Sequence, residues 1–381
     1  MNPAARPGPL LWIPRLAYRL LRPLLFRMDA ERAHDLTLTA WDHIHRWPVI
    51  GGVLSDVMTP PELPLKLMGL SLRNPVGLAA GLDKDGRHVA ALAALGFGWL
   101  ELGTVTPVAQ SGNPQPRLFR LVRERALINR MGFNNGGVAA LAARLAERRA
   151  LPVIGINIGK NRDTPLEDAE RDYILGLQAI HGVADYIAIN VSSPNTPGLR
   201  ALQETDRLGT LLQTLKKEQA RIADATGRYV PIAVKLAPEL GSGIEAVARV
   251  LGETGIDGVI AVNTTLERRH LAPSDGASEA GGLSGVPLRV PAIEMIRRLR
   301  HALPPHTPLI GVGGIASAED AWEHLINGAD AVQLYTGLIY EGPTLVSDVV
   351  RGLRRKALAA GEPNLTQALR IARNRRSSVA L

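Results

Sequence analysis

Uncharged amide side chains recur where the chain's short apolar runs end. Asn157, Asn190 and Asn263 each close such a run, although asparagine is depleted in strands. A single asparagine of this kind could merely cap a turn, but three at equivalent positions indicate a shared site. Amides offer hydrogen-bond donors and acceptors without charge, which complements a planar ligand with alternating N–H and C=O groups, such as a pyrimidine.

Two lysines lie in apolar sequence, where burying an unpaired ammonium group would be costly. Lys84 follows the first apolar run in AAGLDKDG, and Lys235 lies within PIAVKLAP. One of them could bind a substrate carboxylate, and the other could stabilise an anionic reduced cofactor. A purely structural pairing of Lys84 with Asp83 is the alternative.

The other motifs carry weaker signals. IGVGGIAS at 310–317 and YTG at 335–337 place backbone amides beside helix starts, which favours phosphate binding. Ser193 in NVSSPNTPG could take part in chemistry, although serine hydroxyls in turns are common. His43 and His45 diverge on a helix and cysteine is absent, so no metal site is expected.

The elements that must position these residues follow one pattern from residue 72 onward, in which apolar runs alternate with helical segments. The eight runs cover 76–81, 98–105, 153–159, 186–193, 231–238, 258–264, 309–315 and 331–337. This alternation predicts an α/β fold, a parallel (β/α)8 TIM barrel whose strand carboxyl ends form the site. Overlong connections at 106–136 and 265–285 are expected to cover that site.

A doubly wound sheet is the competing fold. Gly311, Gly313 and Ala316 match a dinucleotide-binding pattern after an apolar run. That pattern requires an acidic residue at the end of the next strand, whereas Asp330 precedes the next strand. The barrel is therefore the preferred prediction.

The N-terminal residues 9–27 predict an amphipathic helix. Arg15, Arg19 and Arg22 share one face, and three arginines at the bilayer centre would cost roughly 8–10 kcal/mol. The opposite face is rich in leucine, so we expect the helix to lie in a membrane interface, with Pro23 interrupting it. A second helix, capped by Asp29 and ending near residue 47, completes an N-terminal α-helical hairpin. The alternative is a pair of helices folded onto the main body with solvated arginines.

Composition narrows the class of protein. The chain has 381 residues and a net charge of +8, with 46% hydrophobic residues, which excludes fibrous and wholly disordered proteins. The excess positive charge lies in residues 1–34 and 351–381, while the body is near neutral. Basic ends on a near-neutral body indicate an anionic membrane surface at least as strongly as nucleic acid.

Taken together, the motifs resemble the class 2, quinone-dependent dihydroorotate dehydrogenases of bacterial type. The resemblance covers roughly residues 29–344 and rests on ERAHDL, NPVGLAAGLDKDG, FGWLELGTVTP, PRLFRL, LINRMGFNN, GINIGKN, YIAINVSSPNTPGLR, VPIAVKLAP, NTTL, GGLSG, GVGGI and VQLYTG. It implies oxidation of (S)-dihydroorotate to orotate in the fourth step of pyrimidine (UMP) biosynthesis. The implied cofactor is one FMN per chain, with no metal, and the implied electron acceptor is ubiquinone or menaquinone.

The resemblance also assigns residues. Ser193 would be the base that removes the C5 proton, and His34 and Arg120 would lie along a quinone channel. Val262 stands where the family usually has threonine, so it is left out of the expected site. FMN would contact Ala80, Gly81, Leu82, Asp83, Lys84, Thr104, Asn157, Asn190, Lys235, Gly285, Gly314, Tyr335 and Thr336. Substrate would contact Lys84, Asn129, Arg130, Met131, Gly132, Phe133, Asn190, Asn195, Asn263 and Thr264.

The expected organisation has four parts. Residues 1–50 would form the helical membrane-associating and quinone-channel segment, 51–71 a linker, 72–359 the FMN-binding barrel and 360–381 a basic tail. We expect a monomer without a nucleic-acid partner, held peripherally on the cytoplasmic side of the cell (inner) membrane. Two alternatives are a soluble FMN barrel that uses NAD, fumarate or another acceptor, and a non-catalytic scaffold whose basic ends bind nucleic acid.

Overall fold

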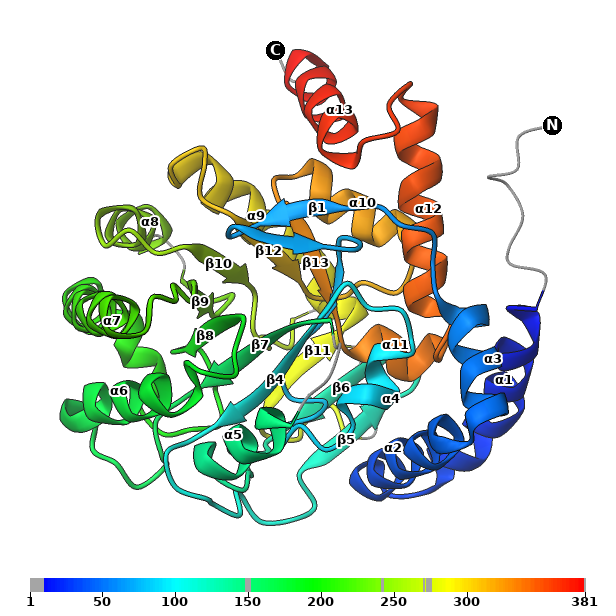
Figure 1. The fold of residues 1–381 in the computed structure, drawn as a ribbon, viewed down its shortest axis with the longest axis horizontal. Helices are drawn as coiled ribbons and strands as arrows, with labels where there is room; N and C mark the ends of the chain where they lie inside the picture. The colour runs from blue at the N-terminus through cyan, green and yellow to red at the C-terminus, as the bar shows by residue number, and fades with distance from the viewer. Residues whose placement is uncertain (1–9, 148–151, 241–242, 270, 272–275, 380–381) are drawn as a thin grey trace.

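The computed structural model describes residues 10–147, 152–240, 243–269, 271 and 276–379. The first nine residues of the expected N-terminal segment and the last two of the expected tail lie outside this description. Eight parallel strands close into a barrel, which confirms the predicted fold class (Figure 1). They are β3 (Val76–Leu78), β4 (Trp99–Val105), β7 (Val153–Ile158), β8 (Tyr186–Asn190), β9 (Ile232–Leu236), β10 (Gly258–Ala261), β12 (Leu309–Val312) and β13 (Ala331–Leu334).

Helices surround the barrel and bury its outer face. They are α4 (Val89–Ala93), α5 (Val138–Ala146), α6 (Ala169–Ile180), α7 (Thr205–Thr226), α8 (Ile244–Glu253), α9 (Arg289–Ala302), α10 (Ala318–Ile326), α11 (Thr336–Glu341) and α12 (Leu345–Ala359). Along α7, Leu208, Leu211, Leu212 and Leu215 are buried at the spacing of one helix face. Strands β8 and β9 are buried throughout because helices cover one face and the barrel interior the other.

A β-hairpin closes the amino end of the barrel. It consists of β1 (Leu65–Leu67) and β2 (Leu70–Leu72), which occupy part of the expected linker. Leu67 and Leu72 pack against the interior rings of Trp99 and Tyr186. The Tyr186 ring lies where a side chain at position 155 would otherwise project, since a Cβ on Gly155 would approach it to 2.1 Å.

The two overlong connections form a second sheet. Strands β5 (Leu118–Leu121), β6 (Ala126–Asn129) and β11 (Gly282–Gly285) pair antiparallel, with β6 in the middle. Gly282 pairs with Asn129, so the connection after β4 is joined to the connection after β10. The sequence analysis did not identify these strands, because they lie outside the repeated strand–helix pattern and pair between two distant connections.

Three helices precede the barrel, α1 (Trp12–Arg27), α2 (Ala30–Arg46) and α3 (Pro48–Met58). Asp29 caps α2 as expected, because its carboxylate accepts hydrogen bonds from Glu31 N and Arg32 N. Helix α1 continues through Pro23, so the expected interruption is wrong. Contacts to the barrel hold the helix on both sides of Pro23 and outweigh the one backbone hydrogen bond that proline removes.

The polar face of α1 is turned toward the protein. Arg15 forms a bidentate ion pair with Asp348 at 2.6 and 2.7 Å, the Tyr18 hydroxyl donates to Ile339 O at 2.5 Å, and Arg22 donates to Tyr340 O at 2.8 Å. Leucines on the other face remain exposed, Leu20 to 69% and Leu24 to 59%. The helix therefore contacts the barrel through Arg15, Tyr18 and Arg22 and presents Leu20 and Leu24 outward.

The C-terminal residues include a helix, α13 (Leu365–Val379), where a basic tail was expected. Leu365, Ala368 and Leu369 are buried, and Arg373 donates to Leu325 O and Ala329 O beside α10. Within the described residues, no helix is both long and apolar enough to cross a membrane.

Two glycines test this packing. Gly155→Ala should destabilise the fold by roughly 1–3 kcal/mol because the added methyl group overlaps the Tyr186 ring. Gly209→Ala, within α7, should stabilise it by roughly 0.5–1 kcal/mol, because the new Cβ meets only Val250 at 3.7 Å and alanine favours the helix. Urea unfolding of both variants measures the difference; a shift in the same direction for both would contradict this account.

Candidate active site

A pocket opens at the carboxyl ends of the barrel strands and is partly covered by the second sheet. Most residues expected from the sequence lie on its wall. These are Ala80, Gly81, Lys84, Thr104, Asn129, Met131, Gly132, Phe133, Asn190, Ser193, Asn195, Lys235, Asn263, Thr264, Gly285, Gly314, Tyr335 and Thr336. The barrel thus brings together residues that are up to about 250 positions apart in the chain.

Amide and hydroxyl groups form one hydrogen-bonded network in the pocket. The Asn190 amide donates to Thr104 Oγ1 at 2.9 Å and to Asn157 Oδ1 at 3.1 Å. Asn263 donates to Ser192 Oγ at 2.9 Å and to Asn190 Oδ1 at 3.4 Å. Because each amide is held by a neighbour, the pocket presents its donors and acceptors in fixed orientations.

A buried charge pair lies beneath this network. Glu101 is fully buried, and one of its oxygens lies 3.5 Å from Lys235 Nζ and accepts from the Asn157 amide at 2.9 Å. Its other oxygen accepts from the Tyr186 hydroxyl and the Gln333 amide, both at 2.7 Å. Burial and the Glu101 carboxylate raise the pKa of Tyr186, which therefore remains a hydrogen-bond donor. Sequence reasoning missed Glu101, although a charged residue inside the apolar run FGWLELG was the available signal.

Lys84 lies on the pocket wall away from that pair. Burial lowers the pKa of Lys84 to about 8, with Glu31 acting in the opposite direction and Arg117 in the same one. Asp83 instead accepts from Arg87 N and His88 N, at 2.9 and 2.8 Å, and so holds the turn before α4. These contacts favour a ligand-binding role for Lys84 over the structural alternative.

The loop that carries Ser193 forms a turn and also lines the pocket. Ser193 Oγ accepts from Asn195 N at 3.3 Å, and the Asn195 amide donates to Asn129 Oδ1 at 3.1 Å. The Thr196 hydroxyl is buried without a hydrogen-bond partner in the described structure. The turn is the expected structural role of such a serine, yet it also directs this serine toward the pocket.

Glycine allows close approach of the backbone where the loop after β12 lines the pocket. Gly314 has φ of +72°, and a Cβ there would lie 2.5 Å from Arg289 Cβ. The side chains of Ser284 and Thr336 meet beside it at 2.8 Å. Backbone N–H groups and hydroxyls gathered in this way are suited to a phosphate group.

Some expected residues lie outside the pocket wall. Leu82 belongs to the core, Asp83 and Asn157 act from behind the wall, and Arg130 bonds to Glu279 and stacks over Phe119. Nine pocket residues are absent from the expected set: Ala79, Val262, Ser284, Leu288, Val312, Gly313, Ile315, Gln333 and Gly337. Seven of them lie within the predicted strand runs, whereas Ser284 and Leu288 lie close to Gly285 in the connection after β10 and the turn that follows it.

His34 and Arg120 lie where the N-terminal helices meet the barrel. Burial, with the positive charges of Lys84 and His88, lowers the pKa of His34 to about 4, so it is neutral at pH 7. Arg120 donates to Phe26 O and Met28 O, at the end of α1, and lies over the Phe26 ring. In the part of the chain that the structure describes, no cluster of three or more acidic or histidine side chains could hold a metal ion.

The fold and the pocket define a (β/α)8-barrel protein with an amide-rich, lysine-containing binding site. The family model for dihydroorotate dehydrogenase matches residues 62–357, and the chain belongs to this family. The dihydroorotate dehydrogenase (quinone) of Chromobacterium violaceum is 54% identical over 339 residues, which cover 88% of this chain and 97% of the relative. That of Marinobacter nauticus is 50% identical over 341 residues, covering 89% and 99%.

A solved structure is similar in shape as well. The crystal structure of DHODH from Eimeria tenella in complex with ferulenol superimposes with a TM-score of 0.79 at 35% sequence identity. The match covers 89% of this chain and 94% of that one. The family resemblance expected from the motifs is thereby confirmed.

Proposed function

We propose that this protein is a quinone-dependent dihydroorotate dehydrogenase that oxidises dihydroorotate to orotate in pyrimidine biosynthesis. The observation that carries the proposal is the placement of Ser193, Lys84 and the asparagine amides around one pocket in a chain of this family. In the overall reaction dihydroorotate loses a proton from C5 and a hydride equivalent from C6. The quinone gains two electrons and two protons and becomes the quinol.

The donor set of the pocket fits FMN. Gln333 lines the pocket, and its buried Oε1 has no hydrogen-bond donor among the described residues, so a ligand N–H or O–H group would satisfy it. Gly314 and Thr336 would hold the phosphate, and Thr104, Asn190 and Lys235 would hold the ring system. When bound, FMN accepts the hydride that leaves C6 and passes the electrons on to the quinone.

The remaining pocket residues suit the substrate. The Lys84 ammonium group would pair with the substrate carboxylate, and the amides of Asn129, Asn195 and Asn263 would bond the ring N–H and C=O groups. Ser193 Oγ would take the C5 proton, and the nearby Thr196 hydroxyl or a water molecule would relay it onward. Lys84 and the amides would stabilise the negative charge that develops on the substrate as the proton leaves.

The proposal is tested with purified protein and dihydroorotate under anaerobic conditions. A yellow protein whose flavin band is bleached by dihydroorotate and restored by a quinone is the expected result. Ser193→Ala should retain FMN, but dihydroorotate should bleach its flavin band about 10²–10⁴ times more slowly, which is the usual scale of general base catalysis. Near-normal bleaching would remove Ser193 from the mechanism, and an oxidised flavin in the wild-type protein would contradict the substrate.

The pKa of Lys84 predicts how orotate binding depends on pH. The protonated ammonium group binds the carboxylate, so affinity is full below a pH of about 8 and falls as the pH rises through that value. The dissociation constant, measured by equilibrium dialysis, should rise by up to tenfold per pH unit above about 8. Lys84→Arg is the control because arginine keeps its charge; its dissociation constant should stay flat, and a flat wild-type profile would exclude this role for Lys84.

The N-terminal helices are the proposed membrane contact. Trp12, Leu20, Leu24 and Trp47 are each about 60–70% exposed, whereas Arg15 and Arg22 of α1 bond to the barrel. An outward apolar face of this kind suits the interface of an anionic bilayer on the cytoplasmic side. A quinone would then reach the pocket between α1, α2 and the barrel, past His34 and Arg120, in a peripheral monomer.

Charged substitutions on that face test the contact. The double variant Leu20→Glu/Leu24→Glu should reduce co-sedimentation with anionic vesicles by at least about 10²-fold, since burying each leucine contributes roughly 1.5–3 kcal/mol. Reduction of a vesicle-borne quinone should fall in parallel, while bleaching by dihydroorotate is unchanged. Leu175→Glu on α6, which is 45% exposed, is the matched control. Equal effects of both substitutions would contradict the proposed face.

A further inference from the structure

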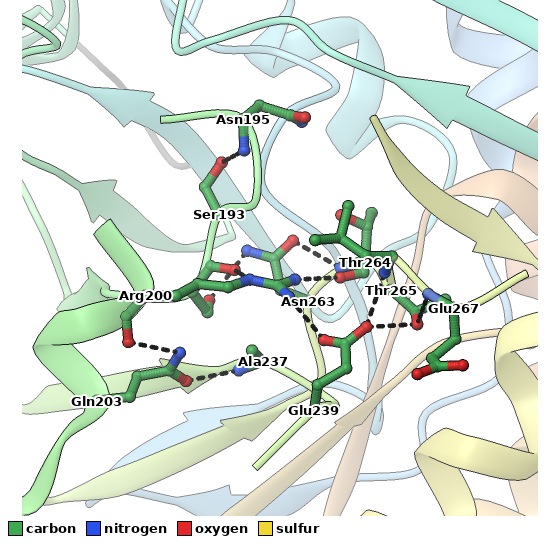
Figure 2. Close-up of polar contacts among 12 residues, drawn as sticks. Ser193, Asn195, Arg200, Gln203, Ala237, Glu239, Asn263, Thr264, Thr265 and Glu267 are labelled. Atoms are coloured by element: carbon green, nitrogen blue, oxygen red, sulfur yellow. Dashed lines mark hydrogen bonds and ion pairs between the residues drawn. The ribbon is translucent and has the colours of Figure 1, made fainter. Parts of the chain in front are cut away.

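A guanidinium group behind the pocket joins three segments of the chain. Arg200 belongs to the short helix η3 (Leu199–Gln203), which follows the loop bearing Ser193. Its Nε donates to Ser192 O at 3.0 Å, and its Nη2 donates to Thr264 O at 2.8 Å. Its Nη1 donates to Glu239 Oε2, also at 2.8 Å (Figure 2).

Glu239 extends these contacts to the second sheet. Its Oε1 accepts from Thr265 Oγ1 at 2.5 Å and from Leu266 N at 2.7 Å. Thr265 in turn exchanges two backbone hydrogen bonds with Leu283, at 3.0 and 2.7 Å, which ties it to β11. The Arg200–Glu239 pair therefore links the loop after β8 to the connection after β10 and, through it, to the cover of the pocket.

The two segments joined by Arg200 carry the proposed base and part of the proposed substrate wall. Ser192 precedes Ser193, and Thr264 lines the pocket beside Asn263. Asn263 also bonds the Ser192 hydroxyl, at 2.9 Å, and accepts from Thr264 N at 2.8 Å. The hydrogen bonds thus close a ring through Ser192, Asn263, Thr264 and Arg200.

Ser193 itself has little direct support. The contact recorded for its hydroxyl is the bond from Asn195 N at 3.3 Å, within the same turn. Its place relative to the opposite wall therefore depends on its backbone, which Arg200 holds through Ser192 O while Ser192 N donates to Asn190 Oδ1 at 3.2 Å. The far side of η3 is also fixed, because Gln203 Oε1 accepts from Ala237 N at 2.8 Å in the loop after β9.

We propose that Arg200, with Glu239 as its counter-charge, is a positioning residue that sets the distance between Ser193 and the substrate held by Asn263 and Thr264. The proposal rests on the dehydrogenase function given above and adds a residue that acts through the backbone without touching the reacting atoms. Each of the three oxygens accepts from a different nitrogen of the planar guanidinium group, whereas the three donors of lysine share one nitrogen, so lysine is not an equivalent replacement. Errors of about 1 Å in such a placement can cost about 10²-fold in rate.

The test compares Arg200→Met and Arg200→Lys with the wild-type holoenzyme. The limiting rate of bleaching by saturating dihydroorotate should fall about 10–100-fold in Arg200→Met, with FMN content and the orotate dissociation constant within about threefold of wild type. Arg200→Lys should recover less than a tenth of the lost rate although it keeps the charge. Arg298→Met, which removes an ion pair to Glu245 at 2.9 Å between α8 and α9, is the matched control and should leave the rate unchanged.

An isotope effect separates positioning from simple loss of folded protein. With dihydroorotate deuterated at C5, the kinetic isotope effect on bleaching should rise in Arg200→Met, because transfer of that proton becomes more rate-limiting. A reduced rate with an unchanged isotope effect would overturn the proposal, since a smaller folded fraction does not alter the ratio. Bleaching at the wild-type rate would overturn it as well.

A substitution of Glu239 tests whether it acts through Arg200. Glu239→Gln should slow bleaching by a smaller factor, and the double variant with Arg200→Met should be no slower than Arg200→Met alone, because both act through one pair. Additive losses would overturn the pairing.

Hydrogen exchange of the backbone amides should accelerate at residues 191–195 and 264–266 in Arg200→Met. If dihydroorotate fails to bleach the wild-type flavin, the proposed function is overturned, while unchanged exchange would overturn the positioning role itself.

Discussion

Closure of eight parallel strands is the constraint on which the site depends. In such a barrel every strand ends at the same rim, so residues from distant parts of the chain must share one space. Asn190, Lys235 and Asn263 come from three consecutive strands and meet there for that reason. The overlong connections add a second sheet over the rim, and the pairing of Gly282 with Asn129 fixes its position.

The barrel interior contains polar and charged side chains where the pocket begins. Their burial is tolerated because the charges are paired. Glu101 accepts three hydrogen bonds besides lying 3.5 Å from Lys235, which offsets the cost of burying a carboxylate. Lys84, by contrast, is buried against α2 with its pKa lowered to about 8. The two lysines therefore face different electrostatic surroundings, as separate roles at a cofactor and at a substrate carboxylate would require.

The N-terminal helices show how amphipathic patterns can mislead about orientation. The arginines of α1 were expected to face the polar side of a membrane interface, yet Arg15 and Arg22 bond to the barrel. The apolar face is left outward, where no part of the described chain covers Leu20 or Leu24 fully. The sequence pattern shows only that α1 has a polar face and an apolar face. The positions of Asp348 and of the Tyr340 carbonyl decide which face packs against the protein.

The sequence by itself determined the parallel barrel, the Asp29 cap and the asparagines and lysines at strand ends, because periodicity and strand-end positions are local properties. Most of the remaining pocket wall came from the resemblance of the motifs to a known family. The sequence did not reveal β5, β6 and β11, which lie outside the alternating strand–helix pattern and whose pairing is made between distant connections. Nor did it single out Glu101 or Arg200. Their partners lie on other strands and loops, so only the closed barrel brings Lys235 to the first and Ser192, Glu239 and Thr264 to the second.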